Sequence, residues 1–588
     1  MPLSQEILDA VKHFIFGLDH VVWNWPSIMP IMVVALLGTG IITTFRLSWI
    51  QIRRFWHGIR VLKGDYDDPE HEGDLSHFQA LSTALSGTIG IGNIAGVATA
   101  IHYGGPGALF WMWVTAVFGM ALKFTECTLA QWFRKVNDKG QASGGPMYYI
   151  EQGLGPKWKW MAVAFACFAA ITPLGMGDAV QSFTVADQFR HDFGVPTLIT
   201  GIVIVIIVGA VILGGIRRIG KVTSKLVPFM CAVYILAGLV VLLLNANEVI
   251  PTLGLIFRSA FQPAAQIGGF AGGGFIFMMT WGVKRGLFSN ESGLGSAPII
   301  HAAARTDQPV REGVVAMLGP FVDTLTVCSI TGLVILTTGV WNQKSMQRLP
   351  VSEQSALVTV VSGTHIHKDG VLPPDKIAAG IFRVDHGHPE GFEMVRNNST
   401  LASMEILRAK GHFLDSGVKP FTGTIMLKKD DGGDPAVAVF RDAGGGVVSK
   451  RHMWVEGKAL QNGSPLTSWA FKKGLGKLAG GKGNYLITLA VFLFAISTSI
   501  SVSYYGDRSV QYLFGDWAIM PYRVVFCVMA FLGAIYSLRM VWSFSDIALG
   551  CMAFPNLIAI LLLTGKVKKR VRTYVESGKL RPPHAGEK

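Results

Sequence analysis

Three glycines and two polar residues interrupt an otherwise apolar stretch, SGTIGIGNIAGVATAI, at residues 86–101. They are Gly87, Thr88, Gly90, Gly92 and Asn93. The glycines are spread around a helix, whereas close helix packing through a GxxxG pattern, the alternative explanation, keeps small residues on one face. The pattern predicts a helix broken at about residues 88–92, whose freed amides and carbonyls can hold a carboxylate or a cation.

A second polar cluster lies in AISTSISVSYYGD, at residues 495–507. Its hydroxyl groups belong to Ser497, Thr498, Ser499 and Ser501. Hard oxygen ligands suit a small cation, and carbonyls freed in the broken helix would complete the coordination shell. The alternative is that these hydroxyls bond to carbonyls of the preceding turn.

Ionisable residues inside apolar segments are costly, so they are candidates for function. Asp178 and Gln181 lie three residues apart in GMGDAVQSF, on one face of a predicted helix, and we expect both to line the ligand cavity. Glu126 follows Lys123 by three residues and is expected to pair with it. Asp323 is expected to serve packing or a hydrogen bond between helices.

The elements that must position these residues are membrane-spanning helices. The chain has 588 residues, of which 50% are hydrophobic and only 15% charged, and its mean hydropathy is +0.41. This composition excludes an ordinary soluble enzyme. Because about 20 helical residues cross a bilayer core, hydropathy predicts about eleven spans. They lie near 29–45, 78–102, 107–133, 158–189, 194–215, 221–245, 265–288, 311–340, 484–506, 518–541 and 546–564.

A second glycine-interrupted segment, IGGFAGGGFIFMMTWG at 267–282, lies five spans after the first. Two interrupted spans in corresponding places of two five-helix halves are typical of inverted-repeat secondary transporters. The predicted fold class is therefore an all-α polytopic membrane protein with a 5+5 inverted repeat, preceded by one additional N-terminal helix.

The net charge of +14 is not gathered into one patch. Basic residues recur in short clusters between apolar runs, as in RLSWIQIRRFWHGIRVLKG (46–64) and KVKKRVR (566–572). By the positive-inside rule these loops face the cytoplasm, so the N-terminus and the loop after residue 340 face outside. We expect a multi-pass protein of the inner (cytoplasmic) membrane that contacts lipid and not nucleic acid.

Residues 342–462 form a long stretch of ordinary polarity, in which short strand patterns alternate with DG and GG turns. This pattern predicts a small, mostly β, external domain, whose ligand or partner the sequence does not identify. The rest divides into an external N-terminal segment (1–28), two membrane parts (29–341 and 463–565) and a basic cytoplasmic tail (566–588).

Two glycine-rich motifs do not fit a nucleotide site. GIGNIAG (90–96) lacks the spacing and the βαβ surroundings of a dinucleotide fold, and GIRRIGKV (215–222) lacks the Ser or Thr that follows the lysine of a phosphate-binding loop. We therefore expect no enzymatic activity and no cofactor, and transport must be driven by an ion gradient or be passive.

Several segments together resemble the alanine or glycine:cation symporter family. The matching segments are SGTIGIGNIAGVATAIHYGGPGALFWMW, GGPMYYIEQGLG, WGVKRGLFSNESGLGSAPIIHAAA, FVDTLTVC and STSISVSYYGDRSVQYLFG. The resemblance covers the whole membrane part. It implies a leucine-transporter-like fold with one added N-terminal helix, and uptake of an amino acid driven by a cation, with sodium as the coupling ion.

Carried over residue by residue, the resemblance implies a substrate site and a sodium site. The breaks at 88–92 and 272–274 would hold the carboxylate and amino group of the substrate. The implied substrate contacts are Thr88, Gly90, Gly92, Asn93, Gln181 and Thr498, with Phe275 and Met278 as an apolar wall. The sodium ion would lie between carbonyls near Ser86 and Ile89 and the hydroxyls of Ser497 and Thr498.

The sequence departs from the family pattern in three places. Val502 stands where a tryptophan is usual, which would widen the pocket, and Asp178 stands where an uncharged residue is more usual. A carboxylate at 178 could meet a cationic group of a substrate or carry a proton. The stretch 342–462 is an insertion between segments that are normally almost adjacent.

The resulting hypothesis is sodium-coupled symport of a small neutral amino acid, such as alanine or glycine in D or L form, by alternating access. Two alternatives stay open. One is an amino-acid sensor that signals through the external domain, and the other is proton-coupled transport that uses Asp178.

Overall fold

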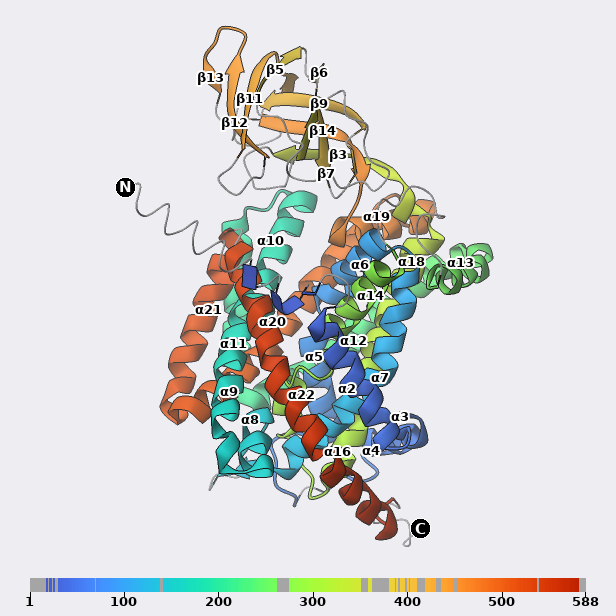
Figure 1. Ribbon diagram of the computed structural model, residues 1–588, viewed down its shortest axis with the longest axis vertical. Helices are drawn as coiled ribbons and strands as arrows, with labels where there is room; N and C mark the ends of the chain where they lie inside the picture. The colour runs from blue at the N-terminus through green and yellow to red at the C-terminus, as the bar shows by residue number, and fades with distance from the viewer. Residues whose placement is uncertain are drawn as a thin grey trace.

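The computed structural model describes most of the chain. The described residues are 17–18, 21–23, 25–26, 30–68, 70–137, 141–261, 274–350, 358–361, 380–385, 388–389, 392–396, 399–400, 402–409, 418–429, 435–448, 453–536 and 539–580. Helices form a tall bundle, and strands gather beyond one end of it, opposite the end at which the chain terminates (Figure 1).

The helices that build the bundle follow one another along the chain on both sides of the strands. Those before the strands are α2 (Ile31–Arg46), α3 (Ile50–Arg53), α4 (Phe55–Leu62), α5 (His77–Thr88), α6 (Val97–Gly104), α7 (Gly107–Trp132), α8 (Pro146–Tyr149), α9 (Lys159–Leu174), α10 (Val180–Phe193), α11 (Thr197–Ile212), α12 (Gly215–Leu244), α13 (Ala246–Ser259), α14 (Phe275–Asn290), α15 (Ala297–His301), α16 (Pro309–Ala316), α17 (Leu318–Pro320) and α18 (Ser329–Thr337). Those after them are α19 (Gly463–Leu475), α20 (Asn484–Phe514), α21 (Ile519–Ile535) and α22 (Arg539–Glu576).

Long apolar helices make this a multi-pass membrane protein. Among the described residues, seven helical stretches are long and apolar enough to cross a bilayer, and the bent pair α5–α6 raises the number to eight. The apolar helices α2 and α11 are shorter, and the chain just before α14 is not described. The predicted count of eleven spans and the inverted repeat therefore stay predictions.

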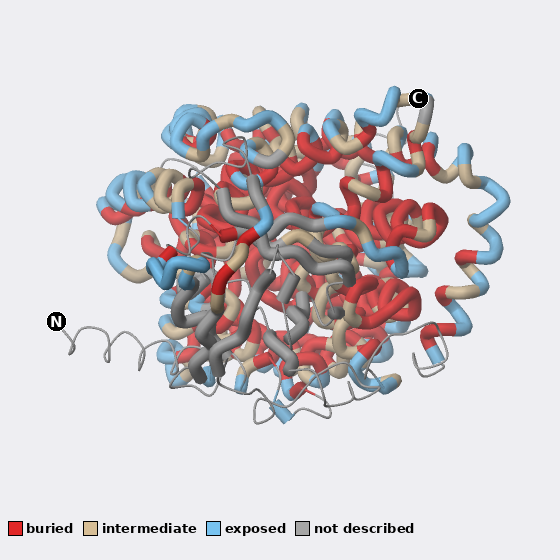
Figure 2. Tube along the Cα trace, turned by 90° about the horizontal axis from the view of Figure 1, so that it is seen from above, coloured by how far each residue is buried: buried red, intermediate tan, exposed pale blue. Residues whose placement is uncertain are grey.

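Buried residues concentrate in the centre of the bundle and exposed ones lie at its periphery (Figure 2). Large apolar side chains nevertheless remain exposed on outer helices, for example Ile206 on α11, Leu243 on α12 and Val524 on α21. Soluble proteins rarely leave so many large apolar groups exposed, whereas a helix surface in contact with lipid tails requires them.

Three helices near the centre contain π-helical segments, η1 (Gly92–Gly96), η4 (Gly175–Ala179) and η6 (Phe321–Cys328). Such segments add a residue to a turn and are frequent at functional sites. The first of them follows a break, because α5 ends at Thr88 and the axes of the two helical parts differ by 55°. The break lies where the glycines predict it.

Most of the second predicted break, including Gly272 and Gly273, lies outside the described residues. The structure resumes at Gly274, which has an extended conformation and precedes the first residue of α14, Phe275.

The stretch between α18 and α19 is built of antiparallel strands. They are β3 (Lys344–Pro350), β4 (Val358–Val361), β5 (Gly380–Asp385), β6 (His388–Pro389), β7 (Phe392–Arg396), β8 (Ser399–Thr400), β9 (Ala402–Ala409), β10 (Val418–Pro420), β11 (Gly423–Lys429), β12 (Pro435–Asp442), β13 (Val447–Val448) and β14 (Met453–Leu460). They form sheets of order β10-β9-β14-β3, β13-β12-β11-β5-β6 and β4-β7-β8. The first and last strands pair with Lys344 opposite Leu460, so the chain leaves and re-enters the bundle at one place.

Candidate functional site

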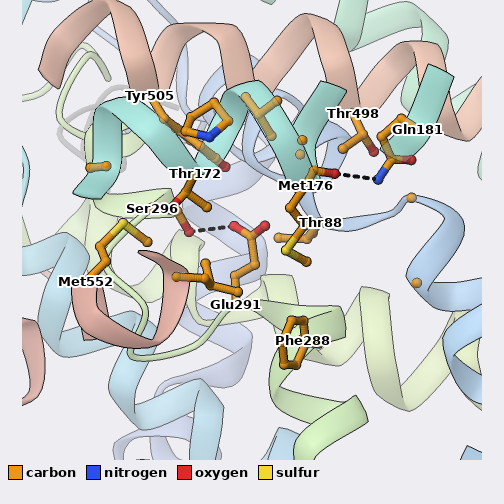
Figure 3. Close-up of a pocket in the computed structure, with 18 of the residues that line it drawn as sticks. Thr88, Thr172, Met176, Gln181, Phe288, Glu291, Ser296, Thr498, Tyr505 and Met552 are labelled. Atoms are coloured by element: carbon orange, nitrogen blue, oxygen red, sulfur yellow. Dashed lines mark hydrogen bonds between the residues drawn. The ribbon is translucent and has the colours of Figure 1, made fainter. Parts of the chain in front are cut away.

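A cavity of about 60 Å³ lies at the break between α5 and η1. It is enclosed by the break, the α9–η4–α10 helix, the loop after α14, α20 and α22, and Figure 3 shows the side chains that surround it. A cavity needs on the order of 10–15 Å³ to hold one water molecule, so this one has room for several water molecules or for a small ligand. Its lining residues are Gly87, Thr88, Gly90, Gly92, Ala169, Thr172, Pro173, Met176, Gly177, Gln181, Phe288, Glu291, Ser296, Ile299, Thr498, Val502, Tyr505, Leu549 and Met552.

The break exposes backbone to this cavity. After Thr88 the chain turns through Ile89 (φ −78°, ψ 86°), and the amide of Gly90 donates to the side-chain Oδ1 of Asn93 at 3.0 Å. Gly90 lies directly against α20, because a Cβ atom placed on it would be 2.7 Å from Thr498 Oγ1. Only glycine allows the backbone to approach α20 this closely.

Asn93 supports the break from behind and does not itself line the cavity. Its Nδ2 donates to Asp323 Oδ1 at 2.6 Å and to Ser289 Oγ at 3.1 Å. Ser289 and Thr324 each donate to Asp323 Oδ2 at 2.7 Å. The expectation that Asp323 makes hydrogen bonds between helices is confirmed, since this carboxylate joins η1, α14 and η6.

Oxygen atoms of α5 and α20 meet one turn below the break. The Ser86 hydroxyl lies 2.5 Å from that of Ser497, and the Thr498 hydroxyl donates to the Ser86 carbonyl at 3.1 Å. Every atom in this group that could coordinate a cation is a hydroxyl or carbonyl oxygen, and Ser86, Ser497 and Thr498 are all buried. Such a set fits a hard cation such as sodium. The structure thus brings Ser86, Ser497 and Thr498 together, with Ile89 at the adjacent helix end.

Gln181 presents an unsatisfied acceptor beside the break, next to Thr498 (Figure 3). Its Nε2 donates to the Met176 carbonyl at 3.4 Å (Figure 3), while its Oε1 is buried and has no hydrogen-bond partner among the described residues. The same Oε1 would lie 3.6 Å from a Cβ atom on Gly90. A buried acceptor without a partner requires a donor from water or a ligand.

The sequence did not single out the residues at the base of the cavity. Glu291, which has a left-handed conformation (φ 53°), accepts a hydrogen bond from Ser296 Oγ at 2.5 Å, and Tyr505 lies beside them (Figure 3). Hydropathy assigns Glu291 to a polar loop, so it is not recognised as an ionisable group in the interior. The motif NESGLG is the part of the sequence that indicates this loop, because its two glycines favour left-handed backbone. Gly293 and Gly295 have positive φ, as Glu291 does.

The loop at the base is held from two other helices. Glu126 of α7 accepts from Asn556 Nδ2 of α22 at 2.9 Å and from the Gly293 amide at 3.4 Å. Lys123 lies 4.0 Å from Glu126 and donates to the Glu291 carbonyl at 3.3 Å. The predicted pairing of Lys123 with Glu126 is confirmed, and its role is to fix this loop.

Asp178 does not line the cavity. It is fully buried in η4, and neither of its carboxylate oxygens has a hydrogen-bond partner among the described residues. The side chain interacts with Ser499 of α20 and with Tyr522 and Cys527 of α21, behind the cavity wall. The prediction that it shares a face with Gln181 assumes a regular α-helix, and the additional residue in the π-helical turn rotates the two side chains apart.

Phe275 and Met278 also lie away from the cavity. Phe275 packs its ring against Trp111, with centroids 5.7 Å apart, and Met278 contacts Gly107 at the start of α7. The cavity instead adjoins the other end of α14, through Phe288. Val502 does line it, and its side chain packs against Gly177, where no Cβ would fit.

Comparison with known proteins identifies relatives along nearly the whole chain. The model of the sodium:alanine symporter family matches residues 8–368 and 444–584. The sodium/alanine symporter AgcS of Methanococcus maripaludis is 39% identical over 572 residues, which cover 97% of each chain. An uncharacterised transporter of Haemophilus influenzae is 33% identical over 97% of this chain and 98% of its own. YrbD of Bacillus subtilis, provisionally named a sodium/proton-dependent alanine carrier protein, is 31% identical over 95% of this chain and 92% of its own.

Proposed function

This chain belongs to the sodium:alanine symporter family, and from that premise we propose that it carries a small neutral amino acid into the cell together with sodium, by alternating access. It is a transporter and not an enzyme. Cation-coupled amino acid symport follows from the family, while the choice of alanine or glycine, of sodium as the ion and of the inner membrane as the location are parts of the proposal.

The observation that carries the proposal is the contact between the broken helix and α20. Backbone at Gly90 meets Thr498 at the cavity, and one turn away the same helix pair supplies the oxygen cluster of Ser86 and Ser497. A ligand carboxylate and a cation would therefore bind to adjacent turns of the same two helices. Broken helices serve secondary transporters in this way.

The cavity walls support a small zwitterionic substrate. Amide groups at the break suit a carboxylate, and the free Oε1 of Gln181 is placed to accept a hydrogen bond from an ammonium group. The rest of the wall is close-packed, since Val502 already fills the space beside Gly177. A volume of about 60 Å³ supports a substrate with a short side chain.

One sodium ion supplies enough energy for this transport. A membrane potential of about 150 mV contributes roughly 3.5 kcal/mol per charge, and a tenfold sodium gradient adds about 1.4 kcal/mol. The total of about 5 kcal/mol supports an amino-acid gradient on the order of a thousandfold. A single cation site would therefore be sufficient.

The direct test is uptake of radiolabelled alanine and glycine into proteoliposomes, with and without an inward sodium gradient. Accumulation that requires sodium is the expected result. Saturable binding without accumulation would contradict the proposal and support a sensor. Competition by a panel of larger and cationic amino acids then defines the substrate range.

Asp178 favours a second candidate, in which protons drive transport or contribute to it. A fully buried carboxyl group without a hydrogen-bond partner among the described residues is more stable when protonated. Ser499, which follows Thr498 on α20, donates to the carbonyl of Gly177 beside Asp178 at 3.3 Å, which supports a role for Asp178 near the proposed cation site.

Replacement of Asp178 with Asn separates the two candidates, because the amide has the same shape but cannot exchange a proton. If protons are coupled through this residue, D178N abolishes the increase in uptake produced by an inward proton gradient. Sodium-driven uptake by D178N that equals the wild-type rate and has the same pH profile would exclude this candidate.

A further inference from the structure

A groove rich in basic residues lies far from the substrate cavity, where the end of α2 meets the last turns of α22. It encloses about 260 Å³. Five basic side chains and one acidic side chain line it, namely Arg46, Arg53, Arg54, Lys568, Arg572 and Glu576. Between them the wall is apolar, with Leu47, Ile50 and Val571 among the lining residues.

Positive charge in this groove is only partly neutralised. Glu576 is paired with Arg572 at 2.6 Å, whereas no carboxylate pairs with Arg53, Arg54 or Lys568 in the part of the chain that the structure describes. Desolvation and the neighbouring charge of Arg53 lower the pKa of the Arg54 guanidinium. Like charges held together at a partly desolvated site favour a bound anion.

The depth of the groove in the membrane can be derived from the adjoining helices. Arg46 is the last residue of the apolar helix α2, and the chain then turns through Ser48 and Trp49, both at positive φ, into α3 and α4. On these short helices Ile52 and Trp56 remain 65% and 75% exposed. Exposed aromatic and apolar residues that follow a span directly are typical of the membrane–water interface, so the groove opens at the level of lipid headgroups.

We propose that this groove binds the phosphate group of an anionic phospholipid, whose acyl chains lie along α2 and α22. Paired guanidinium groups match the geometry of a phosphodiester, and the apolar wall suits the glycerol and the first methylene groups. Basic pockets between spans on the cytoplasmic side recognise lipid headgroups in this manner. The inference does not depend on which amino acid or which ion the protein transports.

Native mass spectrometry of the full-length protein tests the proposal with added phosphatidylglycerol, and with phosphatidylcholine as the neutral lipid. The test variant is R53Q/K568Q. The matched control, K63Q/K569Q, removes the same charge from Lys63, at the end of α4, and from Lys569, next to Lys568 on α22, and neither residue lines the groove. The charge-conserving variant R53K/K568R checks that loss of binding is not loss of folding.

We expect the wild type and R53K/K568R to retain phosphatidylglycerol and release phosphatidylcholine. R53Q/K568Q should bind phosphatidylglycerol at least tenfold more weakly, because each basic residue near an anionic surface contributes appreciably to binding. The affinity of the control variant K63Q/K569Q for phosphatidylglycerol should change less than about threefold. Equal losses in the test and control variants would overturn the proposal, since they would indicate general charge attraction.

A competition experiment distinguishes binding of the whole lipid from binding of a free phosphate ester. Glycerol 3-phosphate at millimolar concentration should not displace the bound phosphatidylglycerol, because it lacks the acyl chains that the apolar wall contacts. Displacement at that concentration would contradict the proposal and identify the groove as a site for free phosphate esters.

Discussion

Gly90 is the residue at which the broken helix, α20 and Gln181 meet. A Cβ atom there would be 2.7 Å from Thr498 Oγ1, and that hydroxyl cannot withdraw without losing its bond to the Ser86 carbonyl. Gly92 lines the same cavity, but a Cβ atom on it would have no neighbour within 4 Å. Gly90 therefore allows a close approach of the break to α20, whereas Gly92 leaves open space in the cavity.

Replacement of Gly90 with Ala should lower uptake at least tenfold, because the methyl group separates the break from α20 and disturbs both ligand sites. Initial uptake rates in proteoliposomes measure the effect. G96A is the matched control and should retain uptake within about threefold of the wild type, because Gly96 in η1 does not line the cavity and a Cβ atom on it would meet only Arg285 Cδ, at 3.9 Å. Similar losses in the two variants would mean that any added methyl group near the break is harmful, and that contact with Thr498 is not the cause.

Six of the ten substrate contacts that the sequence and the family resemblance implied line the cavity, and local geometry explains the others. Thr88, Gly90, Gly92, Gln181, Thr498 and Val502 line it. Asn93 lies behind the break, and Asp178 points away because the π-helical turn changes the phase of the helix. A prediction from residue spacing assumes a regular α-helix, so it cannot detect an additional residue in one turn.

At the scale of elements, the last turns of α22 pack against α4 and α16. The Tyr574 hydroxyl lies 3.0 Å from His57 Nε2 and 3.4 Å from Arg311 Nε, and Tyr66 donates to the Leu580 carbonyl at 2.5 Å. Burial, followed by the charges of Arg60, Arg54 and Arg311, lowers the pKa of His57 from 6.5 to about 4. The imidazole is therefore neutral when the tail is docked.

This pKa shift predicts that the tail loosens in acid. Undocked His57 binds a proton near pH 6.5, whereas docked His57 does so only near pH 4, so docking is strongest above pH 6.5 and weakens as pH falls toward 4. Hydrogen exchange of residues 566–580, corrected for its intrinsic pH dependence, should rise over this range. H57F should remove the dependence, and an identical pH profile in that variant would assign the effect to another group.

The sequence predicts the boundary of an element where its composition changes sharply. It does not predict changes of helix type that depend on contacts between distant residues. The glycines placed the first break correctly, because α5 ends at Thr88 and η1 begins at Gly92. Hydropathy predicts one span at 311–340, and the structure has one continuous apolar helical stretch at Pro309–Thr337, composed of α16, α17, the π-helical segment η6 and α18. The π-helical turns were not predictable from local pattern, because Asn93 and Ser289, which bond to Asp323 in η6, are distant in sequence.

At the scale of the whole molecule, the strand-rich stretch begins and ends side by side. Lys344 in β3 pairs with Leu460 in β14, and Gln461 Nε2 donates to Ser345 Oγ at 2.9 Å. Paired residues on adjacent strands are about 5 Å apart. A few residues of linker can therefore replace everything between them without moving α18 or α19.

Deletion of residues 347–457, with a short Gly-Ser linker in their place, should leave sodium-driven uptake within about threefold of the wild type. None of the residues of this stretch that the structure describes lines the cavity or belongs to the oxygen cluster. Uptake and size-exclusion profiles of the shortened protein provide the check. A folded protein that binds substrate but no longer accumulates it would show that the stretch takes part in the transport cycle.

The helical architecture of the chain was predictable because the bilayer demands long apolar runs, but the strand pairings were not. The turn residues indicated strands in 342–462, yet the order β10-β9-β14-β3 joins strands far apart in sequence. Such pairing depends on side-chain contacts across the sheet and not on local pattern.

The hydroxyl of Thr498 has a consequence for how the two ligands influence each other. It bonds to the Ser86 carbonyl on the side of the oxygen cluster and abuts Gly90 on the side of the cavity. An ion that draws this hydroxyl toward itself changes the surface that the amino acid meets, and the amino acid must act on the ion in return. Thermodynamic reciprocity then requires one factor to describe both effects. Sodium should increase the affinity for the amino acid by the same ratio by which the amino acid increases the affinity for sodium. The variant T498V should bring that ratio toward one.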